Sequence, residues 1–192
     1  DRAGVDAVVT AVLTGTTTVP TDATGDWAAT GLPVGAASGD IDDAPPPAGA
    51  TQTAGTDPTN VTVVAGASTD AGTDGYQPQG DIFGHIFEDT NGDGIQQAGE
   101  PNLPGVNVII TDSQGGTQTV TTDANGDYSA TVPAGSTTAD VDENTLPTGS
   151  VQTAGADPST VNVLAGSNTD IGDDGYQLQG TLSGHIFEDT NG

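Results

Sequence analysis

The stretch Gly84-His-Ile-Phe-Glu-Asp-Thr-Asn-Gly-Asp-Gly-Ile-Gln-Gln-Ala-Gly-Glu100 joins a strand-like segment to an acidic loop. Its first nine residues, 84–92, recur letter for letter at 184–192. Around this match, residues 50–92 agree with residues 150–192 at 28 of 43 positions. The chain is therefore a tandem array of similar units, offset by 100 residues in this region.

The loop that begins at Asp89 has the spacing of a twelve-residue calcium loop, with Asp, Asn, Asp, Gly and Glu at positions one, three, five, six and twelve. Calcium is a hard cation that binds oxygen atoms, and short Asp and Asn side chains at alternate positions supply them. The candidate ligands are Asp89, Asn91, Asp93, the carbonyl of Ile95, Gln97 through a water, and Glu100. A Gly/Asn/Asp turn without metal is the alternative.

The surroundings of this loop favour a β protein. The residues before it have strand-like spacing, and Pro101 and Pro104 follow it, so flanking helices of a helix-loop-helix sensor are not expected. Short segments rich in Val, Ile and Thr alternate with turns along each repeat, and helical periodicity is nowhere sustained. This pattern predicts an all-β fold of tandem Ig-like Greek-key β-sandwiches. The expected strands of the second repeat are 84–88, 106–111, 117–122, 128–132, 137–142, 151–154, 161–164 and 176–179.

The repeat divides the chain into residues 1–83, residues 84–183 and the beginning of a further unit at 184–192. The first unit lacks the opening strand and the calcium loop of the second, while residues 184–192 carry that strand again. Either the segment is cut from a longer run of repeats, or residues 184–192 complete the first unit of the next molecule by strand addition. Either arrangement gives an end-to-end fibre of β domains, and we favour a head-to-tail filament.

Composition restricts the partners. The formal net charge is −26, from 27 acidic residues against one basic residue. Nucleic acid and anionic membranes are excluded as electrostatic partners, and no run of apolar residues is long enough for membrane insertion. So large a charge resists compaction unless cations or high salt screen it, which favours bound calcium, a saline habitat, or both. Cysteine is absent, so disulfides and thiol catalysis are ruled out.

Further acidic clusters have two open interpretations each. Asp123, Asn125 and Asp127 fit a second calcium site or an ordinary hairpin turn, and the counterparts Asp22 and Asp26 flank Thr24 in place of Asn. Before the expected last strand of each unit lie acidic groups that fit a metal shared with the next loop or a solvated turn. They are Asp170, Asp173 and Asp174 in the second unit, and Asp70 and Asp74 in the first. Asp189 and Asn191 begin another calcium loop.

Nothing in the sequence favours catalysis. His85 and His185 occupy the same repeat position without a second histidine or cysteine nearby, and no nucleophile elbow is present. A structural or surface role is expected for both histidines. We therefore expect a protein that is not an enzyme.

Three motifs together resemble the SdrD B-like family, the B-repeat domains of staphylococcal Sdr-type surface adhesins with a collagen-adhesin B-type fold. They are residues 84–101, Leu103-Pro-Gly-Val-Asn-Val108 and Thr122-Asp-Ala-Asn-Gly-Asp-Tyr128. The resemblance implies an Ig-like β-sandwich that binds calcium through the six loop positions named above and acts as a rigid spacer outside the cell. Related domains often carry a Lys–Asn isopeptide crosslink, which this lysine-free chain cannot form.

The expected function is structural: a secreted, calcium-stabilised repeat of an extracellular filament or cell-surface stalk. Its expected partners are copies of itself, joined head to tail, or neighbouring repeats of a longer chain. The alternative is an adhesin or carbohydrate-binding module with a cell-surface or glycan partner, which exposed aromatic residues on one face would favour.

Overall fold

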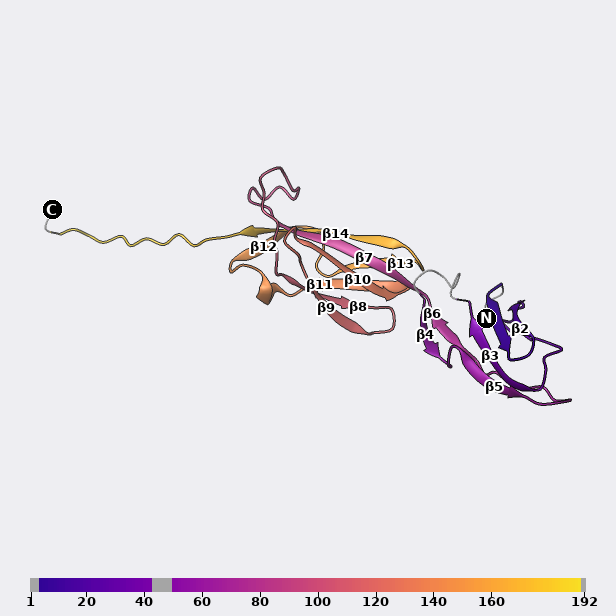
Figure 1. The fold of residues 1–192 in the computed structure, drawn as a ribbon. Helices are drawn as coiled ribbons and strands as arrows, with labels where there is room; N and C mark the ends of the chain where they lie inside the picture. The colour runs from indigo at the N-terminus through magenta and orange to yellow at the C-terminus, as the bar shows by residue number, and fades with distance from the viewer. Residues whose placement is uncertain (1–3, 43–49, 191–192) are drawn as a thin grey trace. The chain divides into compact units, whose positions relative to one another are not determined.

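The computed structural model describes residues 4–42 and 50–190. Two compact units are formed, one by Asp1–Gly80 with Leu164–Ser167 and the other by Asp81–Val163 with Asn168–Gly192. Fourteen strands and one 3₁₀ turn, η1 (Glu143–Thr145), make up the regular structure of the described residues (Figure 1). Within this part of the chain no helix has the length and hydropathy needed to span a membrane.

The second unit is a sandwich of two four-stranded sheets. One sheet has the order β10-β7-β14-β12 and the other the order β13-β11-β8-β9. The strand bounds are β7 (Gln79–Glu88), β8 (Asn107–Thr111), β9 (Thr117–Thr121), β10 (Asp127–Pro133), β11 (Gly135–Val141), β12 (Ser150–Ala154), β13 (Ser159–Val163) and β14 (Asn168–Leu178). The predicted all-β sandwich is confirmed.

Alternating apolar residues build the core of this unit, because successive side chains of a strand point to opposite faces. Ile82 and Ile86 of β7 and Val108 and Ile110 of β8 are each fully buried, so the inner faces of both sheets meet in one apolar cluster. The large aromatic side chains of Phe87, Tyr128 and Tyr176 are buried as well.

Short Asx turns connect the antiparallel strands. In the β8–β9 hairpin, Asp112 Oδ1 accepts hydrogen bonds from the backbone N–H groups of Gln114 (2.8 Å) and Gly116 (2.9 Å). Gly115 has φ +83°, a left-handed conformation that glycine adopts without steric cost.

Two strands are longer than predicted, since β7 begins at Gln79 and β14 at Asn168. Asp170, Asp173 and Asp174, expected to precede the last strand, lie inside β14, which pairs in parallel with β7 from Asn168↔Asp81 to Tyr176↔Glu88. A register shift between Asp170 and Gly172 takes up one residue as a bulge.

The first unit is less complete. Its strands are β1 (Asp6–Ala11), β2 (Gly15–Pro20), β3 (Gly35–Ile41), β4 (Thr51–Ala54), β5 (Thr59–Val63) and β6 (Gly75–Gln77). They form one four-stranded sheet, β2-β1-β3-β5, and a two-stranded sheet, β4-β6. The buried apolar residues of this unit are mostly small: Ala7, Val9, Ala11, Ala37 and Ile41.

Candidate calcium site

The acidic loop starts directly at the end of β7. Asp89 is fully buried, and its N–H donates to the carbonyl of Tyr176 in β14 at 3.0 Å. Its carboxylate accepts three backbone N–H groups of the loop, from Gly92 (2.7 Å), Asp93 (3.2 Å) and Gly94 (2.8 Å). The first predicted ligand therefore lies at the centre of the loop, where the chain wraps around it.

The last predicted ligand closes the same loop. Glu100 Oε1 accepts hydrogen bonds from the N–H groups of Thr90 (2.9 Å) and Asn91 (3.4 Å). Its other oxygen, Oε2, accepts the N–H of Gln97 at 2.9 Å. A single carboxylate thus ties both ends of the loop together, as position twelve of a calcium loop must.

The intermediate ligands contact each other. Asn91 Nδ2 donates to Asp93 Oδ2 at 3.1 Å and to Gln97 Oε1 at 3.0 Å. Gln97 Nε2 donates to both carboxylate oxygens of Asp93, at 2.8 and 2.7 Å. Ile95 has an exposed side chain, and its N–H donates to Asp93 Oδ1 at 3.0 Å. The structure brings all six predicted positions into one loop.

The residues present fit calcium by their chemistry. The three carboxylates offer oxygen atoms only. The two side-chain amides also offer an oxygen atom once the amide group is rotated, and calcium binds oxygen. The carboxylates of Asp93 and Glu100 accept N–H groups and are not gathered around a common point. Among the described residues, no group of three or more His, Cys, Asp or Glu side chains is arranged to hold a metal ion.

The loop rests on the neighbouring strands. Gly94 has φ +80°, and a Cβ there would lie 3.2 Å from the carbonyl oxygen of Thr153 in β12. Gln177 of β14 donates through Nε2 to the carbonyl of Thr90 at 3.3 Å. The Thr153 hydroxyl facing Asp89 lowers the pKa of this carboxyl, and so do the backbone N–H groups of the loop. Burial acts in the opposite direction and raises it. Asp89 is therefore held as an anion.

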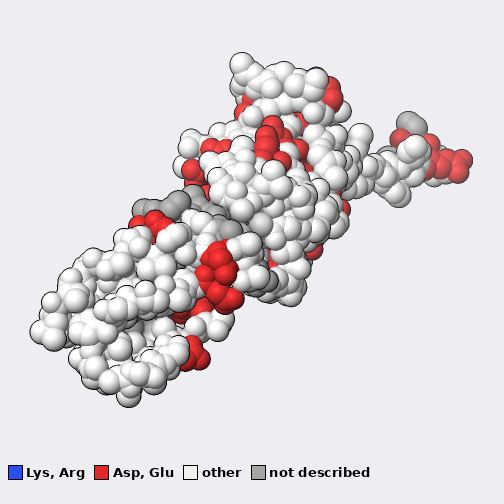
Figure 2. All heavy atoms as spheres, turned by 90° about the vertical axis from the view of Figure 1, so that its right-hand side faces the viewer, with Lys and Arg blue, Asp and Glu red and all other residues white. Residues whose placement is uncertain are grey.

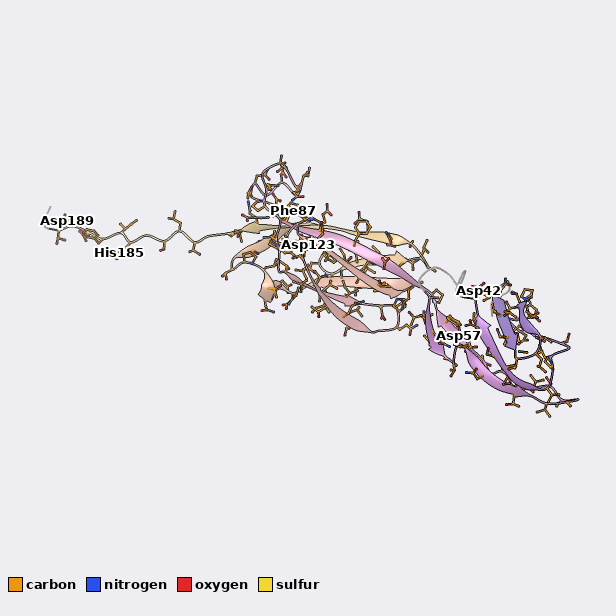
Figure 3. The ribbon with its side chains drawn as sticks, viewed as in Figure 1. Asp42, Asp57, Phe87, Asp123, His185 and Asp189 are labelled. Atoms are coloured by element: carbon orange, nitrogen blue, oxygen red, sulfur yellow. The ribbon has the colours of Figure 1, made fainter. Side chains whose placement is uncertain are left out.

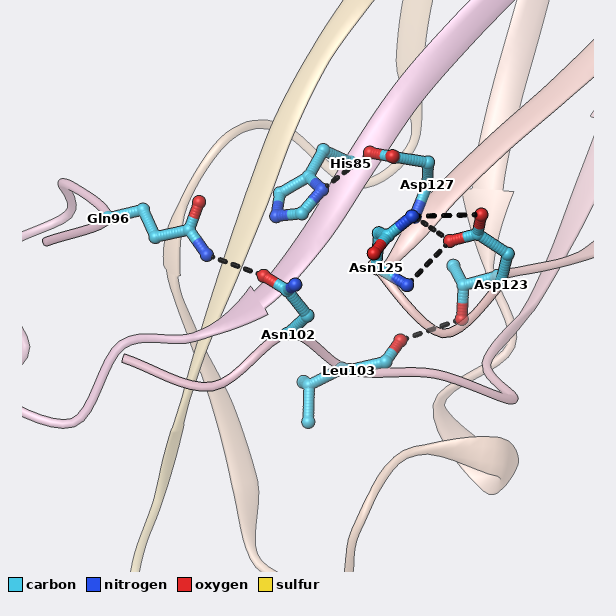
Figure 4. Close-up of polar contacts among 8 residues, drawn as sticks. His85, Gln96, Asn102, Leu103, Asp123, Asn125 and Asp127 are labelled. Carbon is cyan, nitrogen blue, oxygen red and sulfur yellow. Dashed lines mark hydrogen bonds and ion pairs between the residues drawn. The ribbon is translucent and has the colours of Figure 1, made fainter. Parts of the chain in front are cut away.

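The second candidate site is divided in the structure (Figure 4). Asp123 Oδ1 accepts the N–H groups of Asn125 (2.7 Å) and Asp127 (3.1 Å), which is the geometry of an Asp/Asn hairpin turn. The carboxylate of Asp127 turns to His85, with Oδ1 at 2.8 Å from Nδ1. Asn125 Nδ2 donates to Asp123 Oδ2 at 3.5 Å, so these two side chains stay together and only Asp127 is directed away from them.

The acidic group in β14 is divided as well. Asp170 and Asp173 are exposed, whereas Asp174 is buried and accepts Gln152 Nε2 at 3.3 Å. Asp170 Oδ1 caps the N–H of Gly172 at 2.9 Å. Successive residues of a strand face opposite sides, so Asp173 and Asp174 separate. Of the two interpretations, the solvated turn is wrong, because these residues lie in β14. A metal shared with the next loop stays a prediction.

The counterparts in the first unit are held by local hydrogen bonds. Asp22 Oδ1 and Asp26 Oδ2 both accept the Thr24 hydroxyl, at 2.7 and 3.0 Å, so threonine fills the space between the two carboxylates. Asp70 Oδ1 accepts the N–H of Gly72 at 2.8 Å, and Asp74 Oδ1 accepts Gln52 Nε2 at 3.2 Å.

The loop begun by residues 189–191 is described only in part. Asp189 is exposed on the segment that follows β14 (Figure 3). Asn191 lies outside the described residues.

Sequence reasoning missed Asp157, which joins the two sheets of the second unit. Its Oδ1 accepts the N–H of Val141 in β11 at 2.8 Å, and its Oδ2 accepts the hydroxyl of Tyr176 in β14 at 2.9 Å. The first unit repeats this arrangement, with Asp57 accepting Ile41 N–H at 2.9 Å and the hydroxyl of Tyr76. The recurrence of Asp-Pro at the repeat offset was the available signal.

Asp157 also affects its acidic neighbour. Burial raises the pKa of Asp174 to about 7, and the charges of Asp157 and Asp173 add to this effect, while hydrogen bonds from Gln152 and the Ala156 N–H oppose it. Burial likewise raises the pKa of the Tyr176 hydroxyl, helped by its hydrogen bond to Asp157. The region between β12 and β14 therefore holds a carboxyl that ionises close to neutral pH.

Acidic side chains are spread over the surface. Figure 2 shows Asp and Glu in several separate groups on the visible face, with no Lys or Arg among the described residues drawn there. A surface of one sign attracts cations, divalent ones most strongly.

Curated relatives include large staphylococcal proteins. Serine-aspartate repeat-containing protein C of Staphylococcus aureus strain MRSA252 is 38% identical over 120 residues, which cover 62% of this chain and 12% of that protein. Serine-aspartate repeat-containing protein F of Staphylococcus epidermidis is 32% identical over 124 residues, covering 59% of this chain and 7% of that protein. The chain thus spans only a small fraction of the length of the curated relatives it matches.

Solved structures with a similar course of the chain include the Bacillus anthracis TIE protein, with a TM-score of 0.41 and 16% identity over 90% of this chain and 31% of that one. The minor pilin GBS52 of Streptococcus agalactiae has a TM-score of 0.41 and 10% identity over 96% of this chain and 87% of that one. Family assignment rests on sequence: residues 80–178, which contain the whole calcium-type loop and all eight strands of the second sandwich but for the first residue of β7, match the SdrD B-like domain. The chain therefore belongs to the SdrD B-like domain family.

Proposed function

We propose that this protein is a structural, secreted repeat whose acidic loops bind calcium and stiffen an extracellular filament or cell-surface stalk. The observation that carries the proposal is the loop from Asp89 to Glu100, in which three carboxylates and two amides are linked in one hydrogen-bond network. Membership of the SdrD B-like family and the similarity to large staphylococcal repeat proteins support a role as one module of a longer surface protein.

Bound calcium would supply positive charge to the Asp89, Asp93 and Glu100 carboxylates. Asp89 is already oriented by backbone N–H groups, so its position in the loop is prepared. Asn91 and Gln97 now satisfy Asp93 through their N–H₂ groups, and rotation of these amides presents their oxygen atoms instead. A ligand that binds only the folded state stabilises it by mass action. In a chain of net charge −26, neutralisation also lowers repulsion between neighbouring loops.

The proposed assembly is end to end, either as covalently continuous repeats or as separate chains joined head to tail by strand donation. The parallel β7–β14 pairing shows how a strand of the sequence Gly-His-Ile-Phe-Glu fits into such a sandwich. Aromatic residues give little support to a glycan-binding module, since Phe87, Tyr128 and Tyr176 are buried and Phe83 alone among the aromatic side chains of the second sandwich is 45% exposed.

Calcium titration of the melting temperature tests the proposal. Calcium at a hundred times its dissociation constant contributes about 2.7 kcal/mol, which raises the melting temperature of a 100-residue domain by roughly 10 °C. Glu100→Gln removes one carboxylate of the loop and is expected to lose most of this rise. Asp123→Asn, in the divided second cluster, is the matched control and keeps it.

A chelator should return the wild-type melting temperature to that of the metal-free protein. If calcium leaves melting unchanged in the wild type, or if Glu100→Gln and Asp123→Asn lose the effect equally, the Asp89–Glu100 loop is not the site.

A further inference from the structure

Asparagine followed by glycine is a pair with its own chemistry, and this chain contains it in two described loops. The pairs are residues 91–92, in the loop after β7, and residues 125–126, in the turn before β10. The backbone nitrogen that follows an asparagine can attack the side-chain amide carbon, and a glycine at this position has no side chain to hinder the attack. Because the two pairs are identical, their surroundings decide which one reacts.

The attacking nitrogen of the first pair already has a proton acceptor. Gly92 N–H donates to Oδ1 of Asp89 at 2.7 Å, which lies within the distance range of a general base. Asp89 is held as an anion at the centre of the loop, as described above. A backbone amide nitrogen is a poor nucleophile until it loses its proton, so a carboxylate at this atom lowers the barrier to attack.

The oxygen of the attacked amide has a hydrogen-bond donor. Asn91 Oδ1 accepts the N–H of Asp93 at 2.9 Å. Attack on the side-chain carbon places negative charge on this oxygen, and a fixed backbone N–H at this distance stabilises the charge in the manner of an oxyanion hole. The same contact is an Asx turn, which folds the amide of Asn91 back over the backbone that follows it.

The leaving group is also held in place. Asn91 Nδ2 donates to Oδ2 of Asp93 at 3.1 Å and to Oε1 of Gln97 at 3.0 Å. Asn91 and Gly92 are both exposed, so ammonia can leave the loop and water can enter it. The loop therefore provides a base, an oxyanion donor and a solvent path around one amide.

The second pair has none of this arrangement. Gly126 N–H donates to the backbone carbonyl of Asp123 at 3.0 Å, and a neutral carbonyl does not take up the proton. Among the described residues, no N–H or O–H group donates to Oδ1 of Asn125. Gly126 is buried, and its carbonyl accepts the N–H of Ile86 at 2.9 Å, so β7 fixes the backbone of this turn.

We propose that Asn91 is a self-modification site, at which the Asp89 carboxylate and the Asp93 N–H promote conversion of the side-chain amide into a carboxylate. Gly92 N transfers its proton to Asp89 and forms a bond to Cγ of Asn91. The Cγ–Nδ2 bond then breaks, Nδ2 takes up that proton, and ammonia leaves a succinimide ring behind. Water adds to one of the two ring carbonyls and opens the ring to aspartate or isoaspartate. One water is consumed and one ammonia is released, with no oxidation or reduction.

The products change the acidic loop in two different ways. Aspartate adds a carboxylate at position three, where the calcium-loop pattern accepts Asp as readily as Asn. Isoaspartate carries the main chain through the former side-chain carbon, which inserts a methylene into the backbone and displaces the new carboxylate. Calcium binding would therefore change with the age of the protein. This consequence rests on the proposed calcium site, whereas the reaction itself does not.

Tandem mass spectrometry of the whole chain after long incubation with chelator tests the reaction. Glutamate-specific digestion releases residues 89–143 as one peptide, because Pro101 protects the bond after Glu100, so Asn91 and Asn125 are measured together. Both should react at similar rates in urea. In the folded chain Asn91 should react at least about tenfold faster than Asn125, and faster than in urea; a carboxylate is a weak base, so this gain is below the usual range of general base catalysis.

A matched pair of variants tests the role of the base. Asp89→Asn removes the proton acceptor and should slow Asn91 to its rate in urea or below. Asp123→Asn makes the same change in the other turn and should leave the rate at Asn91 unaltered. Far-UV circular dichroism checks that each variant is folded, and the comparison of folded with unfolded wild type decides the matter if Asp89→Asn does not fold.

Three results would overturn the proposal: a slower reaction of Asn91 in the folded chain than in urea, equal rates at Asn91 and Asn125 in the folded chain, or an undiminished rate in folded Asp89→Asn. A parallel incubation with calcium separates this proposal from the calcium site. Calcium should slow the reaction, since Asp89 and Asn91 are both proposed ligands, and Asn91→Asp should need less calcium than the wild type for the same rise in melting temperature. Fast reaction at Asn91 with no effect of calcium on rate or melting would confirm the modification and count against the calcium site.

Discussion

Asp174 is 4% exposed in a strand whose other aspartates, Asp170 and Asp173, face solvent. Successive side chains of a strand point to opposite faces of the sheet. When one face packs on the core, neighbouring acidic residues cannot all keep their carboxylates in water. One carboxylate is therefore buried beside Gln152 and close to Asp157. The cost of this burial depends on pH.

The Asp174 carboxyl gives the first prediction. Its folded-state pKa of about 7 lies above the ordinary aspartate pKa of 3.8, so between these pH values the native state holds a proton that the unfolded state has lost. Its contribution to stability is present below about pH 4 and is lost as the pH rises towards 7. Asp174→Asn is expected to match the wild type near pH 4 and to exceed it at pH 8 by about 2 kcal/mol, after a discount for residual solvent screening. Urea unfolding across this range, with chelator present, measures the difference.

Asp173→Asn is the control, because Asp173 is exposed and its loss should change the pH profile little. Parallel profiles for wild type and Asp174→Asn would show that the buried carboxyl does not ionise in this range.

The contacts of Asp157 were not predicted from the sequence. Its partners, the Val141 N–H and the Tyr176 hydroxyl, are distant in sequence, and only the fold brings them together.

Elements were predictable where their signals are local. Alternating Val, Ile and Thr predicted the strands that became β8 to β13, and the Asp/Asn/Gly spacing predicted the loop around Asp89. The first half of β14 was not predictable in this way, since Asp and Gly are typical of turns. Its strand structure depends on the parallel partner β7, about ninety residues earlier in the chain. Residues 68–74, which are similar in sequence to 168–174, form no strand in the described structure.

The fit of β7 gives the second prediction. Gly84 is enclosed between Tyr128 Oη and the carbonyl oxygen of Gly172, which would lie 2.5 and 2.9 Å from an added Cβ. Gly84→Val should therefore destabilise the second unit by about 2–3 kcal/mol, as overpacking of a filled site does. Gly184→Val, where nothing lies within 4 Å, should leave the unfolding of the chain at low concentration unchanged. Chemical unfolding followed by far-UV circular dichroism compares the two; similar losses would mean that the packing around β7 is not what makes Gly84 necessary.

At the scale of the molecule, the two units differ in how much they bury. The large apolar side chains that are fully buried, among them Phe87, Ile82, Ile86 and Ile110, all belong to the second unit. Burial of apolar area is the main stabilising contribution, so the first unit has less to offset its conformational entropy.

Separate melting of the units is the third prediction. Trp27 lies in the first unit, whereas the three tyrosines are split between the units, with Tyr76 in the first and Tyr128 and Tyr176 in the second. Calorimetry of the dilute protein should show two melting transitions. Trp27 fluorescence should change with the lower one, roughly 10 °C or more below the other. Coincident transitions under all conditions would indicate a single cooperative unit instead.

The net charge of −26 gives the last prediction, which separates general screening from specific binding. Sodium chloride shortens the range of repulsion between all carboxylates, so the melting temperature should rise gradually with salt for every variant. Calcium at the same ionic strength should raise it further, and saturably, through the Asp89–Glu100 loop. Magnesium should do so less, because it prefers a smaller octahedral shell and loses its water reluctantly. Glu100→Gln should therefore respond to sodium, calcium and magnesium almost equally. Calorimetric melting at matched ionic strength measures all three ions; a wild type in which calcium has no advantage over sodium would mean that charge screening alone stabilises this acidic chain.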